Sequence, residues 1–217
     1  MTVRLSKQAR REVIERAAAE VFAERGYRGA SMGEIARRSG VSAPVVYDHF
    51  ASKQDLHLRL LERHYAELRQ IWREQLAGDE PAETRIARAF DAWFAYVQAH
   101  PYAWRMLFRD TTGIPEIEAI HRDVAASSRA AVLPLLAREQ AAQQIAGTAD
   151  PVAMELLWEL VRCVLQGLAL WWYEHQEVPR ARIVATAMNA LWIGFERVAE
   201  GELWTTPATS APPPADP

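Results

Sequence analysis

The chain has 217 residues, of which 50 % are hydrophobic and 24 % are charged, as expected of a globular protein with a substantial core. It contains no apolar run of about 18 residues, and its N-terminal segment predicts a charged amphipathic helix, so we expect neither a membrane span nor a signal peptide. The single cysteine, Cys163, excludes an internal disulfide and fits a reducing compartment. A cytoplasmic protein with no membrane partner is therefore predicted.

The charge of the chain is divided unevenly along its length. The formal net charge is −3, yet residues 1–56 hold ten Lys and Arg against seven Asp and Glu. That segment therefore carries +3 and the rest of the chain carries −6. A basic segment on an acidic remainder is typical of a phosphate-contacting module joined to a domain that does not bind nucleic acid.

The first two helices are predicted from an apolar repeat and a capping pattern. The first runs over about residues 7–25 and ends at Gly26. Ser31 and Glu34 form the capping box S-x-x-E, in which both side chains accept hydrogen bonds from free backbone N–H groups. The second helix should therefore begin at about Met32.

A tight turn and a third helix follow. Gly40 can adopt the left-handed conformation that ends a helix, Ser42 should cap the next helix, and Pro44 fits its first turn. The small Ala36 lets the two helices approach closely, and Val46 fixes their crossing. This spacing predicts a helix-turn-helix, whose second helix enters the major groove of DNA.

A long fourth helix is predicted to join this head to the rest of the chain. The S-x-x-D pattern of Ser52 and Asp55 caps it, and its apolar repeat continues to about Leu76. We therefore place a DNA-binding domain at residues 1–51 and a helical body at residues 52–201. A helix rooted in both units can transmit a tilt from one to the other.

Five further helices are predicted in the body, which makes the whole chain all-α with nine helices. Pro134 should kink the third of the five. Residues 202–217 are rich in Pro, Ala and Thr and cannot pack a core, so they should form a disordered tail. The five helices are expected over residues 83–100, 101–110, 115–144, 150–175 and 179–200.

The last two predicted helices carry more apolar surface than one core can cover. In residues 150–175 the polar side chains fall on one narrow line, and residues 179–200 are apolar on more than one face. A homodimer with a four-helix interface is the simplest way to bury this surface, and it would present two recognition helices about 34–36 Å apart. Alternatively, these helices bind a different protein. The polar line consists of Glu155, Glu159, Arg162 and Gln166.

The stretch from the first helix to Leu56 resembles the tetracycline-repressor (TetR) family of bacterial regulators. Residues 40–56 match the family pattern G-V-S-x-x-x-(V/L)-Y-x-(H/Y)-F-x-(S/N)-K-x-x-L almost position by position, and the resemblance covers roughly a quarter of the chain. The residues that carry it are Ala18, Phe22, Gly26, Tyr27, Ile35, Ala36, Gly40, Val41, Ser42, Tyr47, Phe50, Ser52, Lys53, Asp55 and Leu56.

The resemblance implies a helix-turn-helix head on a body that binds an effector and dimerises through the last two helices. It implies a homodimer on double-stranded DNA with an inverted-repeat operator, acting most often as a repressor that a small molecule releases. We expect no enzymatic activity, cofactor or metal, because the sequence contains no G-x-S-x-G, H-E-x-x-H, phosphate-loop or Cys/His-cluster pattern.

The DNA contacts that the resemblance implies fall at both ends of the helix-turn-helix. The base-reading positions are small and mostly apolar, so contacts to thymine methyl groups should contribute more than Arg–guanine pairs. For Tyr47, a position partly in the core is the alternative to phosphate contact. The base-reading positions are Ser42, Ala43, Pro44 and Val45, and the phosphate-contacting positions are Tyr47, His49 and Lys53. Apart from the resemblance, Ser31 and Arg28 are expected to add phosphate contacts at the start of the second helix, where free N–H groups point outward.

An effector pocket is implied in the body, which is rich in aromatic residues. We expect a mainly apolar or aromatic small molecule, held by one or two hydrogen bonds. His121 and Ser128 lie on the apolar face of the helix over 115–144, which favours a pocket. For His121, the alternative is a core histidine whose hydrogen bonds are all made within the protein. The candidate lining residues are Trp93, Tyr96, Trp104, Phe108, His121, Ser128 and Trp158.

Three other residues of the body have alternatives that matter for function. Arg162 and Gln166 either line the pocket or belong to a solvated stripe, and we favour the stripe. A redox role for Cys163 is not expected, because a thiol among apolar neighbours should be buried and inert.

Overall fold

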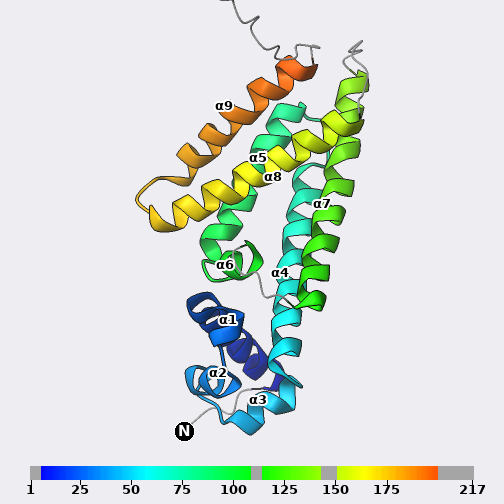
Figure 1. The fold of residues 1–217 in the computed structure, drawn as a ribbon. Helices are drawn as coiled ribbons and strands as arrows, with labels where there is room; N and C mark the ends of the chain where they lie inside the picture. Colours follow the sequence, from blue (N-terminus) through cyan, green and yellow to red (C-terminus); the bar gives the residue numbers. More distant parts are fainter. Residues whose placement is uncertain (1–5, 109–113, 143–150, 200–217) are drawn as a thin grey trace, which may run out of the picture.

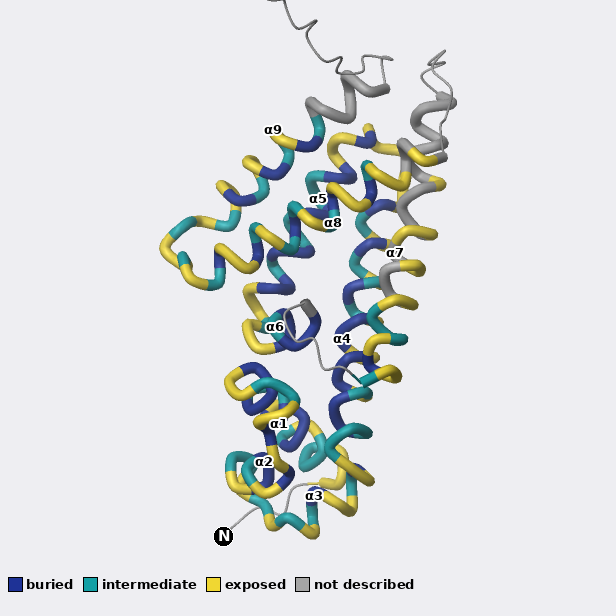
Figure 2. Tube along the Cα trace, viewed as in Figure 1, coloured by how far each residue is buried: buried dark blue, intermediate teal, exposed yellow. Residues whose placement is uncertain are grey.

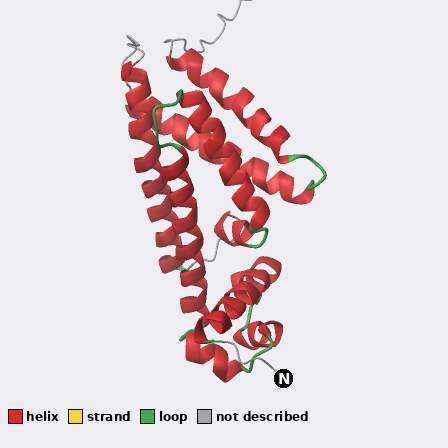
Figure 3. Ribbon diagram, turned by 180° about the vertical axis from the view of Figure 1, so that it is seen from behind, coloured by secondary structure: helices red, strands yellow, loops and turns green. Residues whose placement is uncertain are grey.

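The computed structural model describes residues 6–108, 114–142 and 151–199, and within these ranges it contains helices and no strand (Figure 3). The predicted all-α class and the nine predicted helices are confirmed, with ends that differ by a few residues from those expected. Residues 202–217, predicted to be a disordered tail, lie outside the described ranges. The helices are α1 (Lys7–Gly29), α2 (Met32–Ser39), α3 (Ala43–His49), α4 (Lys53–Gln75), α5 (Ala82–Ala99), α6 (Ala103–Phe108), α7 (Pro115–Ala142), α8 (Pro151–Glu174) and α9 (Arg180–Ala199).

Helices α1, α2 and α3 form a small head at one end of the molecule (Figure 1). Helix α1 is interrupted where expected, because Gly26 has φ 67° and ψ 170° and leaves the helical conformation. The Ser31 hydroxyl accepts from the Glu34 N–H at 3.2 Å and caps α2 as predicted. Apolar side chains of all three helices make the head core, including Ile14, Phe22, Ile35, Val46 and Phe50.

The turn between α2 and α3 depends on Gly40. Its backbone is left-handed, with φ 69° and ψ 24°, and its N–H bonds the Arg37 carbonyl at 3.3 Å. The next N–H, of Val41, bonds the Ala36 carbonyl at 3.1 Å. These two bonds satisfy carbonyl groups that the end of α2 leaves free, and they fix the direction in which α3 departs.

Replacing Gly40 with alanine is expected to lower the free energy of unfolding by about 1 kcal/mol, because a Cβ disfavours the left-handed conformation. No heavy atom would lie within 4 Å of the new Cβ, so the cost should come from the backbone alone. Gly33 is the matched control, since its site is equally open but lies inside α2. Gly33→Ala should instead stabilise by about 0.5–1 kcal/mol. Urea unfolding of both variants checks the opposite signs.

Helix α4 runs out of the head and into the body without a break (Figure 1). It packs against α1 in the head and against α5, α6 and α7 in the body. Its buried face therefore belongs to both units: Leu56 and Leu60 lie next to the head, whereas Leu68 and Trp72 lie in the body core. Figure 2 shows the buried face of α4 continuing along the helix, which is the connection that the sequence predicts.

Helices α8 and α9 cover one side of the body, with α9 packed on α5. Trp172 of α8 is fully buried, and its indole N–H donates to the Val178 carbonyl at 2.7 Å. At the start of α9, Arg180 donates to Asp91 of α5 at 2.8 Å. These contacts fix the hairpin between α8 and α9 against α5, so the outer face of α8 has a defined orientation.

Candidate DNA-binding and effector sites

The recognition helix α3 lies at the outer end of the head (Figure 1). Ser42 occupies its N-cap position, but the hydroxyl makes no capping hydrogen bond and is exposed. Pro44 and Tyr47 are also exposed, Tyr47 to 54 %. The expected capping bond of Ser42 is therefore not formed, and the hydroxyl faces solvent together with the side chains that the sequence assigns to DNA.

The neighbouring positions of α3 are half-buried: Ala43, Val45 and His49 lie at the edge of the head core. The His49 and Phe50 ring centroids are 6.3 Å apart. Because Val46 and Phe50 fill the core from the opposite side of α3, the helix can only present one face outward. The predicted base-reading positions cluster at the start of that helix, where backbone N–H groups also point outward.

The side chains predicted to contact phosphate differ in their exposure to solvent. Arg28 and Ser31 are both exposed, and the Ser31 hydroxyl is also the cap of α2. Lys53 is half-buried, and its ammonium donates to the carbonyls of Tyr27 at 2.8 Å and of Ala30 at 2.9 Å. It also lies 4.5 Å from the centroid of the Tyr27 ring. Lys53 thus ties the start of α4 to the end of α1, a structural role that the sequence did not reveal.

Ion pairs that the sequence did not single out hold α1 against α2. Arg38 of α2 donates to both carboxylate oxygens of Glu24, at 2.6 and 2.8 Å. Arg25 of α1 reaches Glu34 of α2 at 2.9 Å. Because these partners are far apart in sequence, their only signal was the alternation of charges along each helix. Part of the positive charge of the head is therefore used internally.

Five of the seven predicted effector-binding side chains are described by the structure, and they lie in the interior of the body. Trp93, Tyr96, Trp104 and Trp158 are all buried. His121 is half-buried, and its Nδ1 lies 2.5 Å from the Tyr65 hydroxyl. The side chains of Phe108 and Ser128 lie outside the described residues.

Three of these side chains keep a buried polar atom without a hydrogen-bond partner in the described part of the body: Trp104 Nε1, Trp158 Nε1 and His121 Nε2. Tyr65 donates its one hydroxyl proton to the Leu107 carbonyl at 3.1 Å, so His121 must donate from Nδ1 to the Tyr65 oxygen. Burial lowers the pKa of His121 and keeps the ring neutral, so Nε2 is an acceptor. The two indoles are donors. Such unpaired groups are costly in a core.

Arg162 and Gln166 belong to the surface of α8 and not to this interior. Arg162 donates to Glu159 at 2.6 Å and to Gln166 at 3.0 Å, so the polar line of α8 satisfies itself. This is the stripe that we favoured from the sequence.

An apolar stripe runs along the outer face of α8, at spacings of three and four residues. Two leucines in it are among the most exposed large side chains of the described chain, Leu156 at 66 % and Leu160 at 52 %. Cys163 lies in the same stripe and is exposed, so the expectation that it is buried is wrong for the single chain. The α8 stripe consists of Val152, Leu156, Leu160, Cys163, Gly167, Leu170 and Trp171.

The described residues offer neither a metal site nor a membrane-spanning helix. They contain no group of three His, Cys, Asp or Glu side chains placed to hold a metal ion. In the same part of the chain, each helix is too short or too polar to cross a membrane.

Comparison with known proteins agrees with the helix-turn-helix geometry. The family described as "Bacterial regulatory proteins, tetR family" matches residues 14–60, which hold most of the head and the start of α4. The HTH-type transcriptional activator FasR of Mycolicibacterium smegmatis is 30 % identical over 196 residues, which are 90 % of this chain and 87 % of that protein. The chain belongs to the tetR family. It is therefore a DNA-binding transcriptional regulator and not an enzyme.

Solved structures of bacterial transcriptional regulators share the fold over nearly the whole chain. A putative transcriptional regulator from Pseudomonas aeruginosa PAO1 superimposes with a TM-score of 0.72 at 22 % identity, covering 91 % of this chain and 95 % of that one. A TetR-like regulator from Rhodococcus sp. RHA1 also gives 0.72, at 19 % identity, covering 89 % and 99 %. The likeness thus extends through the body, beyond the residues 14–60 that the family model matches.

Proposed function

We propose that this tetR-family regulator binds an inverted-repeat operator as a homodimer and is released from it by a mainly apolar or aromatic small molecule. The observation that supports the proposal best is the continuity of α4, which carries Lys53 in the head and Trp72 in the body core. A ligand that displaces the body end of α4 would tilt the head. DNA and ligand would then favour different conformations of the same chain.

The division of labour follows the two ends of the molecule. We assign DNA binding to residues 1–51, with base contacts from residues 42–45 and phosphate contacts from Arg28, Ser31, Tyr47, His49 and Lys53. Effector binding and dimerisation are assigned to residues 52–201. The exposure of Ser42, Pro44 and Tyr47 supports the DNA-binding assignment.

The effector chemistry follows from the unpartnered atoms in the body. Trp104 and Trp158 offer N–H donors, and His121 offers an acceptor, among otherwise apolar side chains. A fitting ligand is therefore largely apolar and carries both an acceptor and a donor, such as a carbonyl and a hydroxyl. The side chains of Trp93, Tyr96, Phe108 and Ser128 complete the proposed lining.

Dimerisation is assigned to α8 and α9. The α8 stripe supports this assignment because contiguous exposed apolar surface marks an interaction site. Gly167 lies in the middle of the stripe with open space where a Cβ would point, which lets a second helix approach closely. If the stripe bound a different protein instead, analytical ultracentrifugation of the purified chain would find a monomer.

The proposal is tested by fluorescence anisotropy with a duplex that the protein selects from a random DNA pool. We expect saturable binding that is tighter than to scrambled DNA and that weakens steeply with salt, because phosphate contacts release counterions. A compound that quenches the buried tryptophans should then lower the affinity for the selected duplex. Absence of sequence preference, or ligand binding that leaves DNA affinity unchanged, would contradict the proposal.

Repression is the expected sign of regulation, whereas FasR of Mycolicibacterium smegmatis is named an activator. A reporter gene placed behind the selected operator distinguishes repression from activation in the host. Deletion of the regulator should raise reporter expression if it represses and lower it if it activates.

Replacing Tyr47 with alanine is expected to weaken operator binding about tenfold and to leave the melting temperature nearly unchanged. The side chain is 54 % exposed, so its removal leaves no core cavity, whereas a lost phosphate contact costs about 1–2 kcal/mol. Tyr102, an exposed tyrosine of the body, is the matched control. If Tyr102→Ala weakened binding equally, Tyr47 would have no special role at the DNA.

A further inference from the structure

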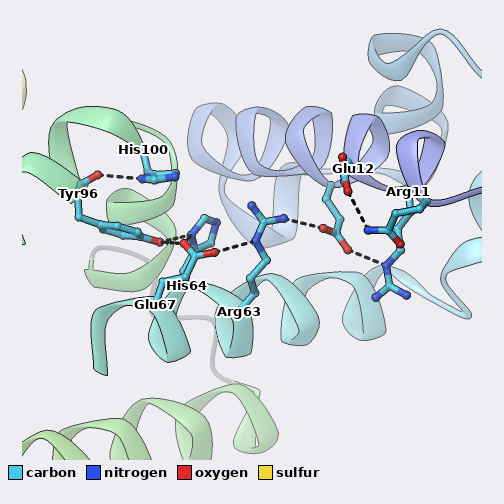
Figure 4. A network of polar contacts seen from close by, with 9 residues as sticks. Arg11, Glu12, Arg63, His64, Glu67, Tyr96 and His100 are labelled. Atoms are coloured by element: carbon cyan, nitrogen blue, oxygen red, sulfur yellow. Dashed lines mark hydrogen bonds and ion pairs between the residues drawn. The ribbon is translucent and has the colours of Figure 1, made fainter. Parts of the chain in front are cut away.

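A continuous line of polar side chains connects the head to the interior of the body (Figure 4). On α1, Arg11 donates to Glu15 Oε1 at 2.9 Å, and Arg63 of α4 donates to Glu15 Oε2 at 2.8 Å. Arg63 also donates to Glu67 Oε1 at 3.2 Å, and the Tyr96 hydroxyl of α5 donates to Glu67 Oε2 at 2.9 Å. We call these five residues the Glu15–Tyr96 relay.

The head end of the relay reaches the recognition helix. The Arg11 guanidinium lies over the ring of Phe50, 5.3 Å from its centroid. Phe50 is the C-cap of α3 and is almost fully buried, so its ring position is linked to the orientation of that helix. Arg11 therefore contacts both the recognition helix and Glu15.

The body end of the relay is ordered by histidines. Tyr96 gives its only hydroxyl proton to Glu67, so His64 must donate from Nδ1 to the Tyr96 oxygen across 2.5 Å. The His100 ring stacks on Tyr96 with centroids 4.2 Å apart. His64 therefore donates to Tyr96, and Tyr96 donates to Glu67. A ligand that accepts a hydrogen bond from the Tyr96 hydroxyl must compete with Glu67 for that proton.

Burial makes Glu15 the central member of the relay. Its carboxylate accepts from two guanidinium groups, one from α1 and one from α4, while the residue is only 8 % exposed. Charge-assisted hydrogen bonds are stronger in such surroundings than at an exposed surface.

A cleft beside the relay gives the head room to move. It has a volume of about 800 Å³ and lies between α1 and the turn that joins α5 to α6. Arg11, Glu15, Arg63 and His64 line it on the side of α1 and α4. On this side of the junction, charged and polar side chains therefore line much of the space between head and body, while α1 also packs on α6.

We propose that the Glu15–Tyr96 relay couples the interior of the body to the recognition helix, with Glu15 as the positioning residue that holds the head in its DNA-binding orientation. This inference rests on the proposed function, because it takes operator binding as the activity that the relay controls. Loss of the Tyr96–Glu67 bond frees Glu67 to turn with Arg63. Glu15 then loses one of its two partners, and Arg11 is no longer held over Phe50.

A double-mutant cycle on the full-length protein tests the coupling without any effector. Operator affinity is measured for Glu15→Gln, Tyr96→Phe and the double variant, with the duplex that the wild type selects. We expect each single variant to bind about five- to tenfold more weakly, and the double variant to bind no more weakly than the poorer single one. Independent sites would instead multiply to about 50-fold, which would overturn the relay. Unchanged affinity in both single variants would do the same.

Glu24→Gln is the matched control, because Glu24 also lies on α1 and accepts from an arginine, but that arginine is Arg38 of α2. We expect its affinity to stay within about twofold of the wild type. If it lost as much as Glu15→Gln, removal of charge from α1 would be the cause and the relay would be wrong.

A second readout does not depend on DNA binding. Spin labels at Asp48 of α3 and Glu83 of α5, with Cys163 replaced by serine, report the distance between head and body. The distribution should be narrow in the wild type and broader in both single variants, with no further broadening in the double variant. Equal widths throughout would overturn the relay even if operator binding failed. Broadening as expected in a protein without sequence preference would contradict only the proposed function.

Discussion

Replacing Leu160 with glutamate is expected to convert the dimer into monomers and to weaken operator binding by about a hundredfold or more. Leu160 is 52 % exposed in the middle of the α8 stripe, so a partner helix would cover it. Because about half of the Leu160 side chain is already buried in the single chain, the variant loses about 1 kcal/mol of apolar burial per protomer, and it forces two carboxylates into an apolar interface. A single head then binds one half-site, without the gain of about 10²–10⁴ that linked binding provides.

Sedimentation and operator affinity are measured on the same samples at nanomolar to micromolar concentration. Ala66→Glu is the control, because Ala66 is exposed on α4, away from the stripe, and the change adds the same charge. It should leave both the sedimentation and the affinity unchanged. A Leu160→Glu protein that stays dimeric would show that α8 does not form the interface.

The reactivity of Cys163 gives an independent check of the same interface. The thiol is exposed in the single chain and lies within the α8 stripe. It should therefore react slowly with a thiol reagent in the wild-type dimer and quickly in Leu160→Glu. Fast reaction in both proteins would place the interface elsewhere.

Local chemistry explains why so much of the fold was predictable. The Ser31 hydroxyl cap and the left-handed Gly40 determine where α2 begins and ends, and both act through neighbouring residues only. The apolar repeat of α4 likewise reveals its length. Such signals are contained in a few consecutive residues, so an isolated sequence displays them.

The parts that were missed depend on residues far apart in the chain. Lys53 was assigned to phosphate contact from its match to the family motif, and that motif gave no sign of its hydrogen bonds to carbonyls at the end of α1. Glu15 shows only an i,i+4 arginine in sequence, while its second partner, Arg63, is on another helix. Apolar neighbours in sequence made Cys163 look buried, although its side of α8 faces outward. The partners of Lys53 and Glu15 and the exposure of Cys163 depend on how each helix is rotated about its axis in the assembled fold.

His57 is the clearest example of a residue whose surroundings only the structure reveals. It lies on α4 with no exposed surface, and both ring nitrogens lack a hydrogen-bond partner in the described part of the chain. The rings of Phe22 and Tyr27 contact it edge-on, with centroids 4.6 and 5.0 Å away. Burial above all, together with the nearby Lys53 ammonium, lowers the pKa of His57 to about 3.

This depressed pKa predicts acid lability with a definite sign. The unfolded chain protonates His57 near pH 6.5 and the folded chain does not, so stability is complete above that pH and falls as the pH drops towards 3. At pH 5 the loss from His57 is about 2 kcal/mol. His64, whose pKa burial lowers to about 4, adds a loss of the same sign.

Replacing His57 with leucine should therefore remove about half of the stability difference between pH 7.5 and pH 5. At pH 7.5 the variant should stay within about 1 kcal/mol of the wild type, because it loses ring contacts but also two unpaired polar atoms. Urea unfolding at both pH values measures the difference, and His175→Leu, at the half-buried end of α8, is the control that should keep the full pH dependence. If His57→Leu lost as much stability in acid as the wild type, His57 would be protonated in the folded chain. The head would then open around α4 at mild acidity, because a charged imidazole cannot remain between Phe22 and Tyr27 without a partner.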